Sequence, residues 1–274
     1  MTRIPAKYHF IFGLKPQTEP FHLAWYLCLR SCIEVNNPDR VFFYYHNEPY
    51  GPWWERIKPE LEMVHVDEVD FIKDSDAYKN SDEGQYIQSM KLEYAHQADF
   101  IRLRALLDHG GVYADIDTLF VQPFPQEFFS KPCVMGREKE LGEHETLCNA
   151  LILAEPHSVF IERWLSRMYE VFDGTWSRHS CLEPAMLSRE MPEMIEVVEQ
   201  EYFYHYPYTT EGLISLLGKV EAPPDKVCSI HMWSHLWWGP ERTDFIHFHN
   251  EMLTEEFIRK YDTTYNLIAR KYLG

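Results

Sequence analysis

The sequence predicts an α/β protein built on a mostly parallel central sheet. Apolar runs of strand length at residues 8–12, 41–45 and 63–66 alternate with helical segments, which is the order of βαβ units. Such sheets bind ligands at the carboxyl ends of their strands. The chain has 274 residues, of which 45% are hydrophobic and 15% aromatic, enough for one large core. We therefore expect a single domain over residues 1–274.

The first half of the chain alternates between strands and helices. Strands are predicted at 8–12, 41–45 and 63–66, and helices at 21–35 and 53–57. Residues 73–88 are polar and aromatic without a clear period. We therefore expect a loop there, able to move over the site.

A longer helix and a strand follow this loop. Ala98, Ile101 and Ala105 recur at helical spacing, Gly110-Gly111 is a helix stop, and residues 112–121 read as one strand. Beyond Pro123 the pattern is less regular. There we expect strands at 133–135 and 150–153, and helices at 159–171, at 184–190 and from 255 onward.

Charge and composition exclude several classes of function. A net charge of -17 opposes binding to nucleic acid or to an anionic lipid surface. No apolar stretch approaches the roughly 18 to 20 residues of a spanning helix, so only peripheral membrane association is compatible with the sequence. The six cysteines form no CxxC pair and the start of the chain has no cleavage signal. We therefore expect a cytoplasmic protein with free thiols.

The strongest candidate for chemistry is Asp115-Ile116-Asp117. Two aspartates one residue apart on a strand point to the same face, where they can present their carboxylates to one hard cation. A cation would also explain how so acidic a protein accepts an anionic ligand. Alone, however, Asp-x-Asp is most often a solvated turn.

The residues around these aspartates carry a resemblance to a known family. Asp99 and Arg102 lie on the predicted helix, and Gly110-Gly111, Tyr113 and the two aspartates follow it. This order resembles the sugar-binding region of glycosyltransferase family 32 and its relatives, including the clostridial glucosylating toxins. The resemblance implies a GT-A type, Rossmann-like fold with flanking helices. It also implies a nucleotide-sugar-binding half at 1–121, and an acceptor side with a closing metal-binding motif at 122–274.

The resemblance implies a role for each residue of this region. Asp115 would contact the donor ribose and a metal ion, and Asp117 would bind the metal directly. Asp99 and Arg102 would hold the transferred sugar. Without the two later aspartates, an exposed ion pair between residues 99 and 102 would be the better interpretation.

The first strand resembles the opening strand of the same family. By that resemblance Phe12 and Gly13 would contact the nucleotide, although Phe12 stands where tryptophan is frequent. His9, on the same strand, is more often a hydrogen-bonded core residue than a catalyst. We therefore assign it a structural role.

The segment Ser229-Ile230-His231-Met232-Trp233 resembles the closing motif of the family, which makes His231 a candidate third metal ligand. An imidazole beside carboxylates favours Mn²⁺, with Mg²⁺ as the second choice. Ser234 and Trp238 would contact the β-phosphate, and packing is the alternative for Trp238. His231 and His235 have a zinc-like spacing, but Met232 stands where a zinc protease needs glutamate.

Two further segments are candidates for sugar contacts. Asn149 resembles a family asparagine beside the reacting sugar, with a turn asparagine as an equal alternative. His179, Ser180 and Glu183 follow Trp176 and would line an acceptor pocket, unless they form a surface helix cap.

The sequence as a whole indicates a metal-dependent hexosyltransferase. By resemblance it would retain anomeric configuration and use a nucleotide sugar, UDP-linked ahead of GDP-mannose, with a saccharide or glycolipid acceptor. A nucleotide-sugar hydrolase and a non-catalytic binding module are the alternatives. The chain lacks GxGxxG, GxxxxGK[ST] and GxSxG, so dinucleotide-binding, P-loop and serine hydrolase classes have no support.

Overall fold

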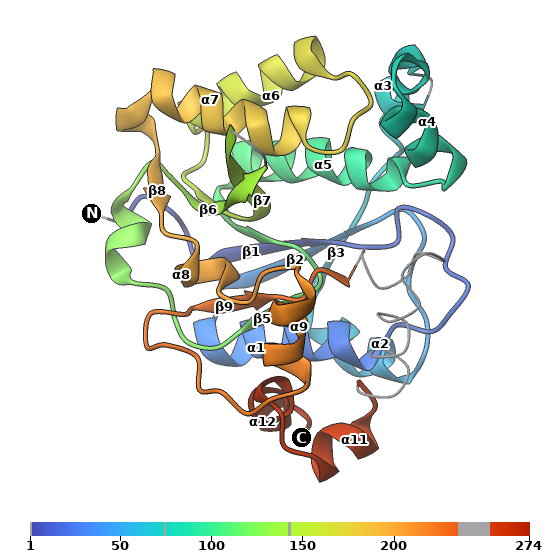
Figure 1. Cartoon of the computed structure of the whole chain (residues 1–274), viewed down its shortest axis with the longest axis vertical. Coiled ribbons are helices and arrows are strands. Elements are labelled where there is room, and N and C mark those ends of the chain that lie inside the picture. The colour runs from blue at the N-terminus through green and yellow to red at the C-terminus, as the bar shows by residue number, and fades with distance from the viewer. Residues whose placement is uncertain (1, 74, 142–143, 235–252) are drawn as a thin grey trace.

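A computed structural model describes residues 2–73, 75–141, 144–234 and 253–274. Its centre is a seven-stranded sheet in the order β3-β2-β1-β4-β7-β6-β8, with helices on both faces (Figure 1). Strands β3, β2, β1 and β4 are mutually parallel, β7 is antiparallel to β4 and β6, and β8 is parallel to β6. The predicted α/β class, with a Rossmann-like and mostly parallel sheet, is confirmed.

The strands are β1 (Lys7–Ile11), β2 (Arg40–Tyr45), β3 (Glu62–His65), β4 (Gly111–Ala114), β5 (Thr118–Phe120), β6 (Cys133–Leu141), β7 (His144–Ala154), β8 (Glu196–Val198) and β9 (Ser229–His231). The α-helices are α1 (Leu23–Asn36), α2 (Pro52–Ile57), α3 (Asp70–Lys73), α4 (Asp82–Ser89), α5 (Glu93–His109), α6 (Val159–Val171), α7 (Glu183–Glu190), α8 (Glu201–Tyr204), α9 (Thr210–Leu217), α11 (Glu255–Lys260) and α12 (Thr264–Ala269). One π-helical turn (Arg178–Leu182) precedes α7, and 3-10 turns occur at Lys58–Glu60, Asp76–Asn80, Gln126–Ser130, Pro192–Met194 and Arg270–Tyr272.

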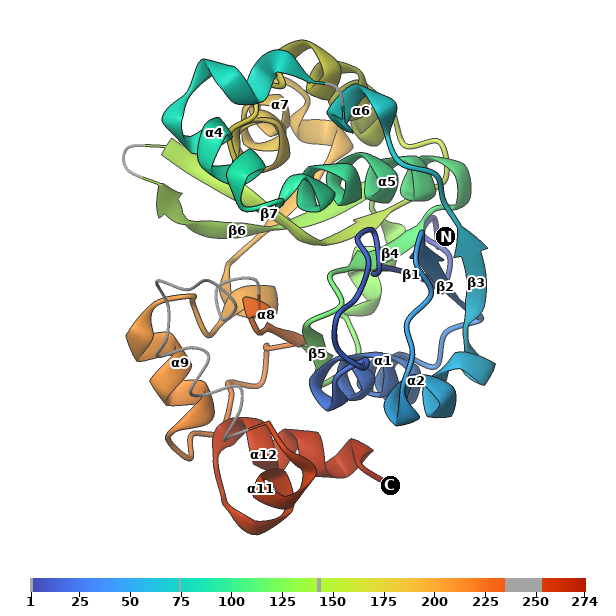
Figure 2. The ribbon, with the colours of Figure 1, turned by 90° about the vertical axis from the view of Figure 1, so that its right-hand side faces the viewer.

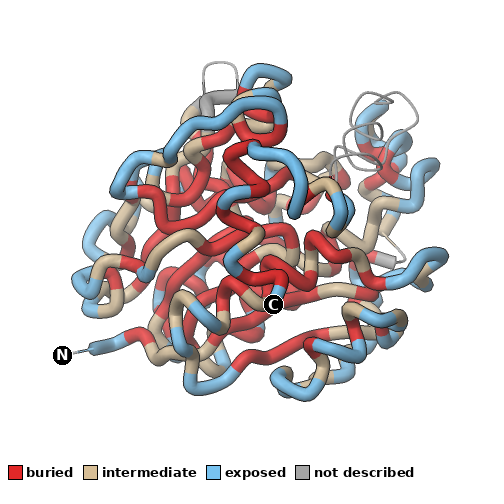
Figure 3. The backbone as a smooth tube through the Cα atoms, turned by 90° about the horizontal axis from the view of Figure 1, so that it is seen from below, coloured by how far each residue is buried: buried red, intermediate tan, exposed pale blue. Residues whose placement is uncertain are grey.

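The central sheet separates two hydrophobic cores. Helices α5, α6 and α7 cover one face, while α1 and α2 cover the other (Figure 2). Side chains alternate along each strand, so Tyr8 and Phe10 of β1 join the core under α1, whereas Ile11 joins the core under α5. In Figure 3, buried residues accordingly run through the interior of the molecule, and exposed residues lie mostly at its periphery.

The junction between α5 and β4 depends on the two glycines that the sequence marks as a helix stop. Helix α5 ends at His109, and Gly110 and Gly111 both have positive φ angles, 59° and 116°. A Cβ on Gly111 would collide with the carbonyl oxygen of Lys7 in the neighbouring strand. The glycine pair therefore lets β4 pair closely with β1 immediately after the helix.

Two predictions of secondary structure are wrong. Residues 73–88 do not form a loop, because Ser75 and Ser81 cap a 3-10 turn and helix α4, which bury Tyr78 and Ile87. These elements are too short to give a clear period in the sequence. Nor is 112–121 one strand, because a turn after Ala114 separates β4 from β5.

Strand β5 leaves the central sheet and pairs with β9 in a separate two-stranded sheet beside α1. The helix expected from 255 is likewise two helices, α11 and α12, the second capped by the Thr263 side chain. Among the residues that the structure describes, no helix combines the length and the apolar character needed to cross a membrane.

Candidate functional site

The two aspartates of the DXD sequence lie in the turn that ends β4. The amide of Asp115 donates to the Ala150 carbonyl of β7, and the amide of Thr118 donates to the Asp115 carbonyl at 3.0 Å. The expectation that both aspartates stand on a strand is therefore corrected. The turn lies at the carboxyl end of β4, which is parallel to β1, so it shares an edge of the sheet with the end of β1.

The closing segment of the chain brings His231 to this turn. Strand β9 pairs with β5, and His231 stands opposite Thr118. Its Nε2 lies 3.1 Å from Oδ1 of Asp117 and 3.7 Å from Oδ2 of Asp115. One potential ligand atom from each of the three residues lies within 4.8 Å of the others. Two carboxylates and an imidazole suit a divalent cation of intermediate hardness, so this donor set fits the metal implied by the sequence.

The charges in this cluster are strongly coupled. Burial alone would raise the pKa of Asp117, but the charge of His231 and hydrogen bonds from His231 and Ser234 hold that pKa well below its ordinary value. Burial lowers the pKa of His231, but Asp117, Asp115 and Glu138 together more than reverse this effect, so the net shift is upward. Burial raises the pKa of Asp115, and Arg102 and His231 offset only part of the rise. Without a metal ion, a proton on His231 balances part of the acidic charge.

Asp117 is held from behind by the chain that follows His231. The backbone amide of Ser234 donates to Oδ2 of Asp117 at 2.7 Å. Trp233 has a φ of 55°, unusual for a bulky residue, and its indole Nε1 donates to the Tyr206 carbonyl at 3.0 Å. Asp117 is only 5% exposed, so it is an interior carboxylate and not part of a solvated turn.

Arg102 of α5 connects this cluster to a second one. Its guanidinium lies 2.9 Å from Oδ1 of Asp99 and 3.2 Å from Oδ1 of Asp115, and it donates to the Asn149 carbonyl at 2.7 Å. Asp99 and Arg102 are 6% and 5% exposed, so the alternative of an exposed helical ion pair is wrong. A buried guanidinium with several acceptors fixes their relative positions.

Tyr113 supports the same arrangement from β4. Its hydroxyl donates to Oδ1 of Asp115 at 2.6 Å, and the guanidinium carbon of Arg102 lies 4.5 Å from the centre of its ring. The sequence marks Tyr113 only as part of a motif. The structure gives it a specific contact to the first aspartate.

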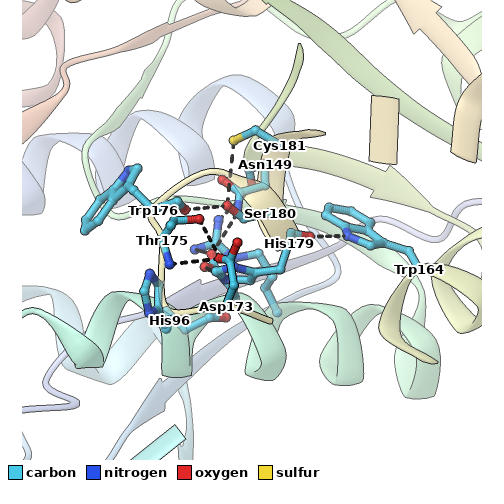
Figure 4. Close-up of polar contacts among 12 residues, drawn as sticks. His96, Asn149, Trp164, Asp173, Thr175, Trp176, His179, Ser180 and Cys181 are labelled. Carbon is cyan, nitrogen blue, oxygen red and sulfur yellow. Dashed lines mark hydrogen bonds and ion pairs between the residues drawn. The ribbon is translucent and has the colours of Figure 1, made fainter. Parts of the chain in front are cut away.

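Asp99 is surrounded by polar groups from three separate elements, and Figure 4 labels two of these residues, Asn149 and His179. Asn149 of β7 donates to Oδ1 at 2.7 Å, and Nε2 of His179 lies 2.9 Å from Oδ2. The register of β6 and β7 shifts between Met135 and Gly136, and this irregularity displaces residues 149–151 from the regular pairing. Asn149 therefore lies in an irregular strand, and its alternative as a turn residue is wrong.

The residues expected at the nucleotide lie at the carboxyl end of β1. The centre of the Phe12 ring lies 5.2 Å from the centre of the Phe21 ring and 4.6 Å from that of Trp25. Gly13 is buried with a φ of 78° against the Asn47 carbonyl, which accounts for a glycine there. A nucleotide contact for Phe12 and Gly13 stays a prediction.

The structural role assigned to His9 agrees with its surroundings. His9 is buried, its Nε2 lies 2.8 Å from the Gly110 carbonyl oxygen, and its Nδ1 lies 3.1 Å from the Tyr44 hydroxyl. Burial lowers its pKa to about 4. His9 is therefore a neutral core residue that links β1 to the end of α5.

The segment proposed for an acceptor pocket is interior. His179, Ser180 and Glu183 are all buried, so the surface-cap alternative is wrong. Ser180 donates to the Trp176 carbonyl, and Glu183 forms an ion pair with Arg167. Trp238 and His235 lie outside the described residues.

One cation near the site was not predicted from the sequence. Lys15 follows β1, and its Nζ lies 4.2 Å from the centre of the Tyr94 ring at the start of α5. Burial and, after it, the charge of Asp117 raise the pKa of Tyr94, so this ring lies within electrostatic reach of the metal cluster. A single lysine in a loop carries no sequence pattern that would have identified it.

Comparison with known proteins gives a consistent picture. The model of a family described as "glycosyltransferase sugar-binding region containing DXD motif" matches residues 30–145. Glucan organizing enzyme 1 of Cryptococcus neoformans var. grubii is 30% identical over 288 residues, which covers 99% of this chain and 71% of that protein.

Two solved structures are also similar. The apo form of the glycosyltransferase GlyE of Streptococcus pneumoniae has a TM-score of 0.48 at 9% identity and covers 98% of this chain and 63% of its own. The PaToxG glycosyltransferase has a TM-score of 0.44 at 18% identity, covering 69% of this chain and 70% of its own.

Proposed function

This chain belongs to the family of glycosyltransferases whose sugar-binding region contains a DXD motif, with a fold of the GT-A type, and we propose that it is a metal-dependent hexosyltransferase. One observation carries this proposal. A continuous set of polar contacts joins the candidate metal ligands to the candidate sugar-binding residues, in the order Asp117, His231, Asp115, Arg102 and Asp99. Such a set would align a nucleotide diphosphate with the sugar that it carries.

In this proposal Asp115, Asp117 and His231 hold a divalent cation, Mn²⁺ ahead of Mg²⁺. When bound, the cation would supply positive charge that stabilises the negative charge of a leaving diphosphate. Ser234 holds Asp117 by its backbone amide, and Tyr113 holds Asp115 by its hydroxyl. These two hydrogen bonds fix the directions of the carboxylates before any ligand arrives.

Arg102 and Asp99 would bind the transferred hexose, with Asn149 beside them. A carboxylate accepts hydrogen bonds from sugar hydroxyls, and Asp99 is kept ionised because Arg102 and His179 together outweigh the effect of burial on its pKa. Arg102 orients Asp99 and Asp115 at once, since one planar guanidinium contacts both. Phe12, Gly13, Asp115 and Trp238 are the proposed contacts to the nucleotide, with Asp115 on the ribose.

For the donor we propose a UDP-linked hexose ahead of GDP-mannose, with retention of anomeric configuration. Both follow from the resemblance of the motif region to the glucosylating toxins. We nominate no general base, because in a retaining transfer on one face the leaving diphosphate itself can take the proton of the acceptor.

For the acceptor we propose a saccharide, with a glycolipid as the alternative. The name of the cryptococcal relative, glucan organizing enzyme, supports a polysaccharide-related acceptor. Its similarity extends over nearly the whole of this chain, so it includes the proposed acceptor half at residues 122–274.

The direct test is release of nucleoside diphosphate. The protein is incubated with a panel of UDP- and GDP-sugars and Mn²⁺, with and without glucan oligosaccharides, and the released diphosphate is measured. Release that requires an acceptor supports a transferase. Equal release without any acceptor would instead identify a nucleotide-sugar hydrolase.

Titration calorimetry separates both enzymes from a non-catalytic binding module. A binding module would take up UDP or GDP more tightly with Mn²⁺ but would turn over none of the sugars. If Mn²⁺ does not strengthen the binding of either diphosphate, the proposal for the Asp115, Asp117 and His231 site is wrong.

A further inference from the structure

Asp99 has fewer free acceptor positions than a carboxylate in solution. Its Oδ1 accepts a hydrogen bond from Asn149 at 2.7 Å and forms an ion pair with the Arg102 guanidinium at 2.9 Å, and its Oδ2 lies 2.9 Å from Nε2 of His179. An ionised carboxylate offers about four acceptor positions. Three of them therefore face a donor or a cation of the protein, and one position on Oδ2 is left for a ligand.

The ring of His179 is fixed from several directions. It is 0% exposed, and its backbone carbonyl accepts a hydrogen bond from the indole of Trp164 at 2.9 Å (Figure 4). The ring meets His96 edge-on at 4.8 Å and Phe172 edge-on at 5.0 Å. It stands in the π-helical turn Arg178–Leu182, a rare geometry that is frequent at functional sites.

The hydrogen bonding of His179 shows what the ring contributes. Arg102 and His179 lower the pKa of Asp99 despite its burial, so this carboxylate is an acceptor and Nε2 of His179 must carry the hydrogen. The other ring nitrogen, Nδ1, is buried and has no hydrogen-bond partner among the described residues. A buried polar atom without a partner costs stability that an apolar ring would not. The contact to Asp99 therefore explains why an imidazole stands at this position, where packing alone would favour an apolar ring.

We propose that His179 is a positioning residue for Asp99, which fixes the rotation of the carboxylate and leaves it one acceptor position, for a single hydroxyl of the transferred sugar. The proposal rests on the proposed function, in which Asp99 binds that sugar. It makes the enzyme sensitive to the configuration at one hydroxyl. A sugar with that hydroxyl inverted cannot be accommodated by turning the carboxylate, because three donors hold it.

Removing the donor on His179 would free a second acceptor position on Oδ2. The carboxylate would keep its contacts to Asn149 and Arg102 through Oδ1, but it could then accept a hydroxyl from either of two directions. Discrimination between epimers should fall. The diphosphate should bind as before, because the Asp117 and His231 cluster does not contact His179.

The test compares one apolar and one polar replacement of His179 with a matched control. His179→Phe removes the donor and keeps a ring, His179→Gln keeps an N–H donor, and His96→Phe alters a neighbouring buried imidazole that does not contact Asp99. For each variant, kcat/KM is measured with UDP-glucose and UDP-galactose. The affinity for UDP with Mn²⁺ is measured by calorimetry, and folding by thermal unfolding.

We expect His179→Phe to reduce the ratio of kcat/KM for the two epimers by about tenfold, with UDP affinity unchanged within about twofold. His179→Gln should recover most of the ratio, and His96→Phe should keep it. An unchanged ratio in folded His179→Phe would overturn the proposal. So would an equal loss in His96→Phe, since that would indicate a general packing effect.

A measurement on the unaltered protein covers the case in which His179→Phe does not fold. In ¹⁵N NMR, a non-hydrolysable UDP-sugar analogue should shift the Nε2–H signal of His179, whereas UDP alone should leave it in place. Identical spectra with the two ligands would refute the role of His179. If the unaltered protein releases no diphosphate from any donor, the proposed function fails, and this proposal fails with it. If the unaltered protein turns over a donor but His179→Phe keeps its epimer ratio, only the role of His179 is refuted, and the proposed function stands.

Discussion

Nε2 of His231 lies 3.1 Å from Oδ1 of Asp117, and both side chains are almost fully buried. When His231 is protonated, this contact is an ion pair between an imidazolium and a carboxylate. The same two atoms are the proposed ligands of a divalent cation. Protons and metal ions therefore compete for one place in the structure.

This competition sets a pH dependence of stability without metal. The pKa of His231 is raised in the folded state, because the nearby carboxylates, Asp117 foremost, outweigh the effect of burial. Its stabilisation is therefore complete below the pKa of an unfolded histidine, about 6.5, and is lost as pH rises through the folded pKa. Thermal unfolding in the presence of a chelator should show this loss on the alkaline side. His231→Gln should remove that part of the pH dependence.

Metal binding should have the opposite pH dependence. Below the folded pKa of His231, each Mn²⁺ must displace about one proton, so its affinity should rise up to about tenfold per pH unit. Above that pKa the affinity should level off. Calorimetry in buffers with different ionisation enthalpies measures the released proton directly. Affinity that stays constant from about pH 5.5 to 8 would contradict His231 as a ligand.

Asp117→Asn should abolish metal-dependent turnover. The asparagine oxygen can still accept the hydrogen bond from the Ser234 amide, whereas alanine would leave that buried donor unpaired at a cost of about 1 to 3 kcal/mol. Asparagine therefore separates the loss of charge from the loss of structure. We expect a decrease in kcat/KM on the order of 100-fold or more, measured as diphosphate release.

The control for this variant is Asp108→Asn, which removes one negative charge from an exposed position of α5. It should leave both turnover and Mn²⁺ activation unchanged. If Asp117→Asn folds and retains Mn²⁺-dependent activity near that of the control, Asp117 is not a metal ligand.

The sequence was sufficient to predict the class of fold and the main cluster of the site. Strand-length apolar runs, the Gly110-Gly111 stop and the DXD sequence all report on local structure, which short-range patterns describe well. The closing segment at residues 229–233 could be assigned through its resemblance to a family motif. The structure places His231 beside Asp117, and its role as a metal ligand stays a prediction.

Contacts between residues far apart in the chain could not be predicted from local sequence patterns. Taken alone, Asp99 and Arg102 would be interpreted as an exposed helical pair, because their burial depends on α6, β7 and the π-helical turn, which contact α5 from elsewhere in the chain. His179 could not be assigned to Asp99, since no local pattern connects the two residues. The turn at Asp115 was missed because the apolar residues on either side of it belong to two different sheets.

Lys15→Met should weaken binding of the nucleotide sugar donor. Lys15 lies over the Tyr94 ring and forms no ion pair with any residue that the structure describes, so its charge is available to a diphosphate. We expect KM for the donor to rise by about three- to tenfold, with kcat and the melting temperature little changed. The effect should shrink at high salt. An equal KM at low ionic strength would exclude Lys15 from the donor site.

Gly111→Ala should destabilise the fold. Gly111 has a φ of 116°, and a Cβ there would collide with the Lys7 carbonyl oxygen, so strain and a clash combine. We expect a loss of more than about 2 kcal/mol in the free energy of unfolding. Gly218→Ala is the matched control, because Gly218 has a negative φ of -117°, which alanine can adopt. This variant should lose less than about 1 kcal/mol. Urea unfolding of both variants measures the difference.

Arg102→Met tests whether one guanidinium holds the two halves of the site together. Without it, the buried carboxylate of Asp99 and the partly buried carboxylate of Asp115 lose their shared cation, which should cost about 3 to 5 kcal/mol and lower the melting temperature by about 10 °C. Arg102→Lys should fold better but still lose turnover, because an ammonium cannot contact both carboxylates and the Asn149 carbonyl in one plane.

The matched control is Arg104→Met, which changes an exposed arginine on the same helix whose guanidinium donates to the Tyr169 hydroxyl. Calorimetric unfolding and diphosphate release are measured for all three variants. Equal melting temperatures for Arg102→Met and Arg104→Met would show that Asp99 and Asp115 do not depend on Arg102. We expect the melting temperature to fall only in Arg102→Met, and turnover to be lost in both Arg102→Met and Arg102→Lys. The reason is that, among the described residues of α5, only Arg102 contacts both carboxylates.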